Sequence, residues 1–74
     1  MIKMVNNISD IIRGARCEEI LGRALDYRNR GRFEPHMIKM YDSQLRMYYK
    51  LKEQIKNEAI LTYLTELERV RLEK

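Results

Sequence analysis

Residues 28–41 read RNRGRFEPHMIKMY, and the composition of this stretch differs from that of the rest of the chain. It contains three arginines, a glycine, the only proline and the only histidine: Arg28, Arg30, Arg32, Gly31, Pro35 and His36. Proline suits the first turn of a helix, because the N–H groups there have no intrahelical acceptor. We therefore predict that one helix ends near Arg30, that residues 31–34 form a turn, and that a second helix begins at Pro35.

Gly31 is the residue of this turn best suited to a sharp change of direction. Helices commonly end with a residue in the left-handed conformation, which glycine adopts without steric cost. We predict a positive φ at Gly31 and a loss of roughly 1 kcal/mol or more in the variant Gly31→Val. Arginines in the last turn of the first helix also suit the negative end of its dipole.

Helix-forming residues dominate on both sides of the turn, and no strand-like alternation persists. The sequence thus predicts an all-α antiparallel helical hairpin. Ser9 is the expected N-cap of the first helix, over residues 9–30, with Asp10 at the positive end of its dipole and residues 1–8 as an N-terminal arm. Its apolar positions form two stripes that do not join, with Gly14 between them: Ile8, Ile11, Ile12 and Ala15, then Cys17, Ile20, Leu21, Ala24, Leu25 and Tyr27. A break at Gly14, with residues 1–13 as a separate short helix or arm, is therefore an alternative to one continuous helix.

The second helix carries an apolar stripe at spacings of three and four residues, and we expect it to face the first helix. Its members are Met37, Tyr41, Leu45, Tyr48, Leu51 and Ile55. Beyond Lys56 the stripe shifts phase, so two arrangements fit. Either a long helix continues with a bend over residues 35–72, which we favour, or it breaks near Asn57, which then caps a third helix folded back on the hairpin.

The chain of 74 residues is expected to form one small domain, residues 1–74, whose core alone supplies little net stability. A single cysteine, Cys17, excludes an internal disulfide, and there is no set of ligands for a metal. We expect no cofactor and no contact with a membrane, because no window approaches the ~20 apolar residues of a membrane span. This composition predicts a cytoplasmic protein that buries further apolar surface by self-association or by binding a partner.

The segment after Asn57 is the predicted interaction helix, over residues 57–74. In a hairpin with one long helix its apolar stripe has no intrachain cover, which is typical of a surface that binds a protein partner or another copy. The partner-binding residues predicted here are Ile60, Tyr63, Leu64, Leu67 and Val70. A charge at Leu64 is accordingly expected to abolish partner capture while residues 8–56 stay folded.

Nucleic acid or a nucleotide is the alternative partner. The net charge is +4, and residues through Lys56 hold twelve Lys and Arg against seven Asp and Glu. The predicted anion contacts are Arg28, Arg30, Arg32 and Lys39, which lie at one end of the hairpin. Acidic residues are interspersed throughout, however, and they weaken any basic stripe.

Catalytic residues are not expected. Cys17 lies among apolar neighbours and is predicted to be a buried packing cysteine, whereas His36 has no Asp or Cys partner in the turn and is predicted to be exposed. Met40, Met47 and Tyr49 fall off the main stripe and form a second face suited to protein contact. The expected architecture resembles small bacterial and bacteriophage proteins, namely the co-chaperones of type III secretion needle subunits and the helical modulators of nucleoid proteins. The resemblance implies only that such hairpins act by binding other proteins, and it assigns no residue a role. We expect a non-enzymatic adaptor, inhibitor or chaperone-like regulator that acts through helix-to-helix contact.

Overall fold

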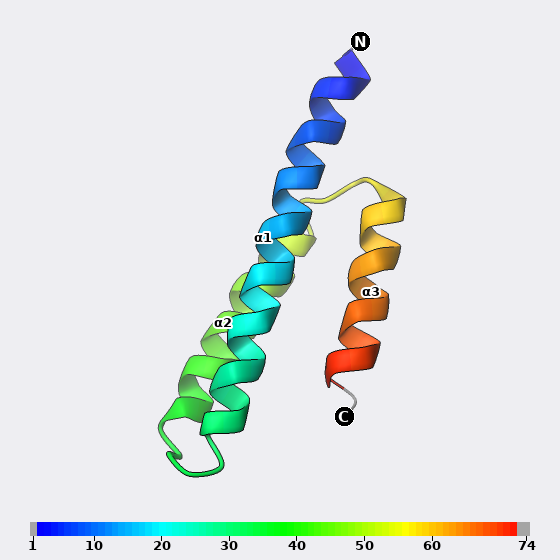
Figure 1. The fold of residues 1–74 in the computed structure, drawn as a ribbon. Coiled ribbons are helices and arrows are strands. Elements are labelled where there is room, and N and C mark those ends of the chain that lie inside the picture. The colour runs from blue at the N-terminus through cyan, green and yellow to red at the C-terminus, as the bar shows by residue number, and fades with distance from the viewer. Residues whose placement is uncertain (1, 73–74) are drawn as a thin grey trace.

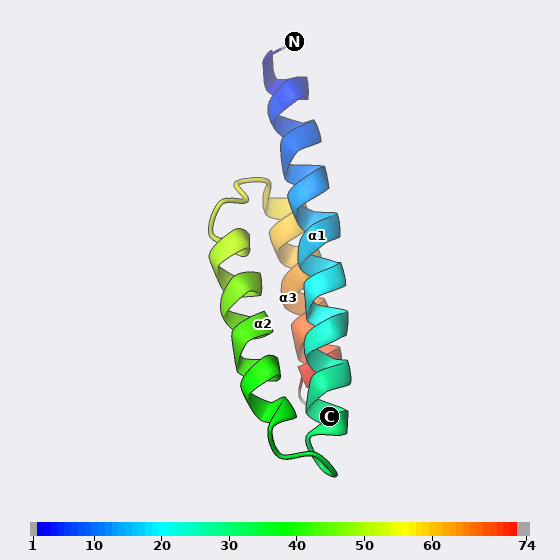
Figure 2. The same ribbon diagram turned by 90° about the vertical axis from the view of Figure 1, so that its left-hand side faces the viewer.

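The computed structural model describes residues 2–72, which form three helices: α1 (Ile2–Arg30), α2 (Met37–Lys52) and α3 (Glu58–Leu72). α1 and α2 lie side by side in opposite directions, and α3 runs alongside in the same direction as α1 (Figure 1, Figure 2). The prediction of an all-α protein is confirmed. The molecule is elongated, at 50 × 19 × 14 Å, and the first turns of α1 project beyond the other two helices.

The helix α1 is continuous through Gly14, and it begins at Ile2 rather than at the predicted N-cap Ser9. The two apolar stripes fail to join because they lie on opposite sides of this one helix. Leu21, in the second stripe, is completely buried, whereas Ile12, in the first stripe, is 56% exposed. The interruption at residue 14 is thus a change of face and not a break.

Asp10 is a buried residue in the middle of α1, so the prediction that it stabilises the start of the helix is wrong. Its Oδ2 atom accepts hydrogen bonds from the backbone N–H groups of Lys56, at 3.1 Å, and Asn57, at 2.8 Å. Its Oδ1 atom accepts a bond of 3.1 Å from the guanidinium of Arg13. One carboxylate therefore fastens the connection between α2 and α3 to α1.

The chain reverses between Lys52 and Glu58, so the favoured continuous helix over residues 35–72 is wrong, and the break near Asn57 is what the structure contains. The Oδ1 atom of Asn57 accepts hydrogen bonds from the N–H groups of Ala59, at 2.9 Å, and Ile60, at 3.2 Å. These bonds satisfy free donors of the first turn of α3, as an asparagine N-cap does. The cap and the Asp10 carboxylate together direct α3 back along α1.

Gly14 is a point of close contact between α1 and α3. A Cβ atom added at Gly14 would lie only 2.8 Å from Cγ2 of Ile60. That methyl group is on a β-branched side chain, which has little freedom to turn away in a helix. The absence of a side chain at Gly14 therefore leaves the space that Ile60 of α3 occupies against α1.

The core receives side chains from all three helices and from the segment after α2. Its buried apolar members are Cys17, Leu21, Ala24, Tyr48, Ile55 and Leu64. Tyr48 is the largest of them, and its hydroxyl donates a 2.6 Å hydrogen bond to Oε2 of Glu68 on α3. The Nζ atom of Lys52 pairs with the same carboxylate oxygen, so α2 and α3 are joined by a polar cluster at the edge of the core.

Tyr48 makes the stability of the folded protein depend on pH in the alkaline range. Burial, followed by the hydrogen bond to Glu68, raises the pKa of Tyr48 above its ordinary value of 10.0. The folded protein holds this proton more tightly than the unfolded chain, so the stabilisation is complete below pH 10 and declines as the pH rises above it. In a titration followed by phenolate absorbance, we expect one of the five tyrosines to ionise only as the helical circular dichroism is lost. The variant Tyr48→Phe should lack this late step, and five tyrosines ionising together near pH 10 in a folded protein would contradict the burial.

The turn between α1 and α2 covers residues 31–36, and α1 ends at Arg30 as predicted. α2 begins at Met37, two residues after the expected start at Pro35. The N–H groups of Met37, Ile38 and Lys39 bond to the carbonyls three residues earlier, at 2.9, 3.1 and 3.3 Å. This tighter spacing is that of a 3₁₀ turn, so the proline enters a turn that leads into the helix.

Gly31 does not have a positive φ, and no residue in the described chain does, so the predicted left-handed conformation is wrong. A Cβ atom at Gly31 would instead collide with the end of the Ile38 side chain and lie 3.3 Å from the carbonyl oxygen of Arg28. We expect Gly31→Ala to lower stability by about 1 kcal/mol through crowding. Chemical denaturation should show this loss disappearing when Ile38→Ala is also present. An equal loss in both backgrounds would indicate backbone strain instead.

Candidate functional site

The apolar stripe of α3 is largely covered by the other two helices, contrary to the sequence prediction. Leu64 is completely buried, and Ile60 and Leu67 are half-buried against the core. Tyr63 and Val70 lie at the edge and are about half exposed. The predicted partner-binding residues therefore do not form one open surface, because α3 folds back and uses the centre of its stripe for the core.

The four predicted anion contacts separate into two groups. The guanidinium of Arg28 donates to the carbonyl oxygens of Leu72, at 3.2 Å, and Arg71, at 3.4 Å, and so caps the C-terminal end of α3. The other three residues are exposed around the turn between α1 and α2: Arg30, Arg32 and Lys39. Phe33, which the sequence reasoning did not single out, is 86% exposed at the tip of this turn.

Cys17 and His36 occupy the environments that the sequence predicted. Cys17 is completely buried, and its thiol donates a 3.8 Å hydrogen bond to the carbonyl oxygen of Tyr48. Burial raises the pKa of the Cys17 thiol, which lowers its reactivity. His36 is exposed, with its Nε2 atom 3.8 Å from a carboxylate oxygen of Glu34. In the described residues, no three His, Cys, Asp or Glu side chains are grouped as a metal ion would require.

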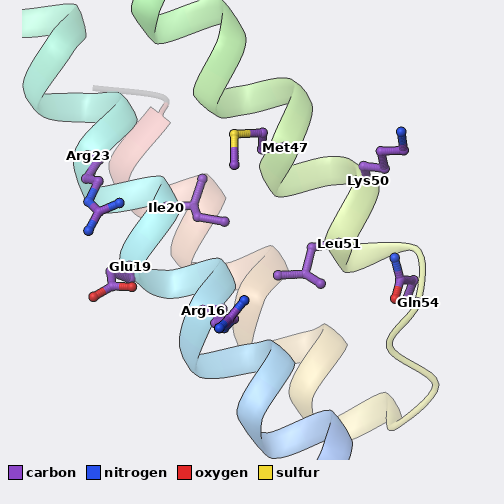
Figure 3. Close-up of a pocket in the computed structure, with 8 residues that line it drawn as sticks. All are labelled: Arg16, Glu19, Ile20, Arg23, Met47, Lys50, Leu51 and Gln54. Carbon is purple, nitrogen blue, oxygen red and sulfur yellow. The ribbon is translucent and has the colours of Figure 1, made fainter.

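A groove lies between α1 and α2 and has a volume of about 490 Å³. Figure 3 shows Ile20 of α1 and Leu51 of α2 pointing toward each other between the two helices, with α3 behind them. Met47 lies beside them and is 51% exposed. These three side chains give the groove an apolar floor, on the side of the hairpin opposite to α3.

Charged and polar side chains form the rim of the groove. They are Arg16, Glu19 and Arg23 on α1, Lys50 on α2, and Gln54 in the connection after α2. Three of these five side chains are cationic and one is anionic, so the rim has a net positive charge. The arrangement combines a soft apolar floor with basic edges.

A second hollow continues the basic surface along α2 and shares Met47 and Lys50 with the groove. It adds Lys39 and Arg46, together with Asp42 and Ser43. Lys39, Arg46 and Lys50 fall on one side of α2 because they are spaced seven and four residues apart. Along α2 the two hollows together extend from Lys39 to Leu51, about 18 Å at the rise of an α-helix.

Sequence reasoning identified some groove residues but not the groove. It placed Met47 on a face away from the main stripe, and that side chain is indeed exposed in the floor. Ile20 and Leu51 were assigned to the core, and they are half-buried at its margin. The missed signal was the row of basic residues next to Met47, which becomes a rim only when Arg16 and Arg23 of α1 lie opposite.

Comparisons of this chain with protein-family models, with curated proteins and with solved structures found no match. None of the helices over residues 2–72 combines the length and apolar character needed to cross a membrane.

Proposed function

We propose that this protein is a small non-enzymatic interaction module, an adaptor, inhibitor or chaperone-like regulator, whose groove between α1 and α2 binds an amphipathic helix with acidic flanks. The observation that carries the proposal is the apolar floor of Ile20, Met47 and Leu51 enclosed by a mostly cationic rim. Amphipathic helices bind in such grooves through apolar residues spaced three and four apart.

The chemistry of the floor favours a protein partner. Met47 is unbranched and polarizable, and exposed methionines of this kind adapt to apolar side chains of varied shape. Half-buried Ile20 and Leu51 have apolar surface left to bury. Burying that surface under a partner's leucines gives binding energy, at about 25 cal/mol for each Å² removed from water.

The charge of the rim favours an acidic partner. Across the two hollows there are five cationic side chains and two acidic ones: Arg16, Arg23, Lys39, Arg46 and Lys50, against Glu19 and Asp42. Complementary charges at a rim increase the association rate and discourage partners of the same sign. The hollows extend far enough for about three turns of a bound helix, at 5.4 Å per turn.

A pair of synthetic peptides tests this proposal. Both carry the same leucine stripe over about five helical turns, and only the flanking residues differ, glutamate in one and lysine in the other. We expect fluorescence anisotropy to show that the acidic peptide binds and the basic one does not. Met47→Glu should weaken binding at least about tenfold, a loss of about 1.4 kcal/mol.

The matched control for Met47→Glu is Ala59→Glu, which adds the same charge at an exposed position on α3. It should bind the acidic peptide as the unmodified protein does. Equal affinity for the two peptides, preference for the basic peptide, or an equal loss in Ala59→Glu would count against the proposal. So would the absence of binding by either peptide.

Nucleic-acid binding at the turn between α1 and α2 remains the alternative proposal. Arg30, Arg32 and Lys39 are exposed there, and Phe33 offers a ring on which a base can stack. Its support is narrower, because Arg28 is engaged with α3 and Glu34 lies within the turn. Filter binding of a single-stranded oligonucleotide at low and moderate salt decides it. If binding is salt-sensitive and is lost when Arg30→Ala and Arg32→Ala are combined, the result would favour nucleic acid over an acidic helix as the partner.

A further inference from the structure

A second apolar surface lies on the N-terminal half of α1 and is separate from the groove. We call it the α1 patch, and its members are Ile8, Ile11, Ile12 and Ala15. The three isoleucines are 56%, 58% and 56% exposed, and Ala15 is also exposed. None of the four lines the groove between α1 and α2.

The α1 patch is on the side of α1 away from the other helices. At 3.6 residues per turn, Ile8, Ile12 and Ala15 point roughly opposite to the buried residues Asp10 and Leu21. The N-terminal turns of α1 also project beyond α2 and α3 (Figure 1). The described chain therefore has no segment over this patch, and its spacings of three, one and three residues are those of a helix-packing face.

We propose that the α1 patch is covered by the same patch of a second copy, in an antiparallel α1–α1 dimer. This inference does not depend on the proposed function of the groove. The patch has no charged member, so two copies meet without repulsion. The twofold axis that sets Ile11 against Ile12 also sets Ile8 against Ala15, so that a large side chain faces a small one. A surface that matches itself about a twofold axis is what a symmetric dimer requires.

The antiparallel direction follows from two acids further along α1, Glu19, which is also on the rim of the groove, and Asp26. Glu19 and Asp26 are exposed beyond the α1 patch. In a parallel pair each of these acids would lie opposite the same residue of the second copy. Like charges directly opposed destabilise an interface, so parallel pairing is disfavoured. In the antiparallel pair the two copies of Glu19 are separated by about 22 Å along the helix axis. α2 and α3 of each copy remain on the far side of its α1 and do not obstruct the contact.

The interface is small, so the dimer is expected to be weak, with a dissociation constant on the order of tens of micromolar. Analytical ultracentrifugation over a range from about one to several hundred micromolar measures it. We expect a reversible monomer–dimer equilibrium that Ile12→Glu shifts to monomer throughout this range. Met40→Glu is the control, because it places the same charge at another exposed apolar side chain, on α2. It should dimerise as the unmodified protein does.

Two additional variants make the outcome decisive. Asp26→Asn should leave the dissociation constant unchanged, and a marked gain in affinity would indicate parallel pairing, in which the substitution removes the repulsion between two opposed carboxylates, and would overturn the assigned geometry. Circular dichroism should show that Ile12→Glu is folded, and Ile12→Ser is the substitute if it is not. A strict monomer at several hundred micromolar, or a dimer that these Ile12 variants leave intact, would overturn the inference. The acidic-peptide assay on Ile12→Glu distinguishes this failure from failure of the groove, since Ile12 does not line it.

Discussion

Replacing Leu64 with alanine is expected to lower the free energy of unfolding by about 2–5 kcal/mol, and replacing it with glutamate is expected to unfold the protein. Leu64 is completely buried among side chains of the three helices. Alanine at this position leaves a cavity, and glutamate places a charge without a partner in the core. A domain of this size has only a few kcal/mol of stability to lose.

Urea denaturation followed by circular dichroism measures both Leu64 variants. Val70→Ala is the control, because Val70 belongs to the same helix and is half exposed, so its loss should be within about 1 kcal/mol. If Leu64→Glu kept a cooperative fold and lost only the ability to bind a partner, α3 would be an extended interaction helix. That outcome would restore the prediction drawn from the sequence and contradict the structure.

Asp10→Ala is expected to destabilise the protein by about 1–3 kcal/mol, although the change is made in the interior of a helix, where alanine is favoured. The carboxylate accepts hydrogen bonds from the N–H groups of Lys56 and Asn57, which have no substitute acceptor in the connection. Hydrogen exchange should also show that these two amides lose protection. Both effects follow from one contact between α1 and the connection of α2 to α3.

Asp26→Ala is the matched control for Asp10, since it removes an exposed carboxylate from the same helix. Its effect on stability should be within about 0.5 kcal/mol. Equal losses in the two variants would mean that removal of a charge from α1, and not the contact with the connection, determines the change. Unaltered exchange at Lys56 and Asn57 would likewise argue against the contact.

Local signals in the sequence were sufficient to predict much of the fold. The end of α1 at Arg30 was predicted from the glycine and proline that follow it, and the structure has that boundary. The asparagine cap at Asn57 was recognised as one of two arrangements, and its side chain does cap α3. Each of these features depends on residues only a few positions apart, so a pattern in the sequence can reveal it.

The errors concern contacts between distant parts of the chain. Asp10 has the position and chemistry of a first-turn residue, and only the three-dimensional structure shows that its partners lie 46 and 47 residues away. Gly14 looked like a break because its packing against Ile60 is not visible in the sequence. The stripe on α3 looked uncovered for the same reason, since the reversal after Lys52 is what brings it to the core.

The groove could be predicted only in part. Periodicity shows which side of α2 carries Lys39, Arg46 and Lys50, and it separates Met47 from the core stripe. It does not show which side of α1 lies opposite, because α1 has apolar residues on two faces. The pairing of Arg16 and Arg23 with the basic side of α2 depends on how the two helices are rotated against each other.

The most direct measurement is a selection of binding helices from a displayed library. The library contains single helices whose flanking residues range from acidic to basic, and the selection shows which helices bind the groove between α1 and α2. We predict enrichment of helices with an apolar stripe and acidic flanks, whose binding is lost with the bait variant Met47→Glu and kept with Ala59→Glu. Enrichment of basic or uncharged helices, binding that persists with Met47→Glu, or no enrichment at all would contradict the proposal that this groove receives an acidic amphipathic helix.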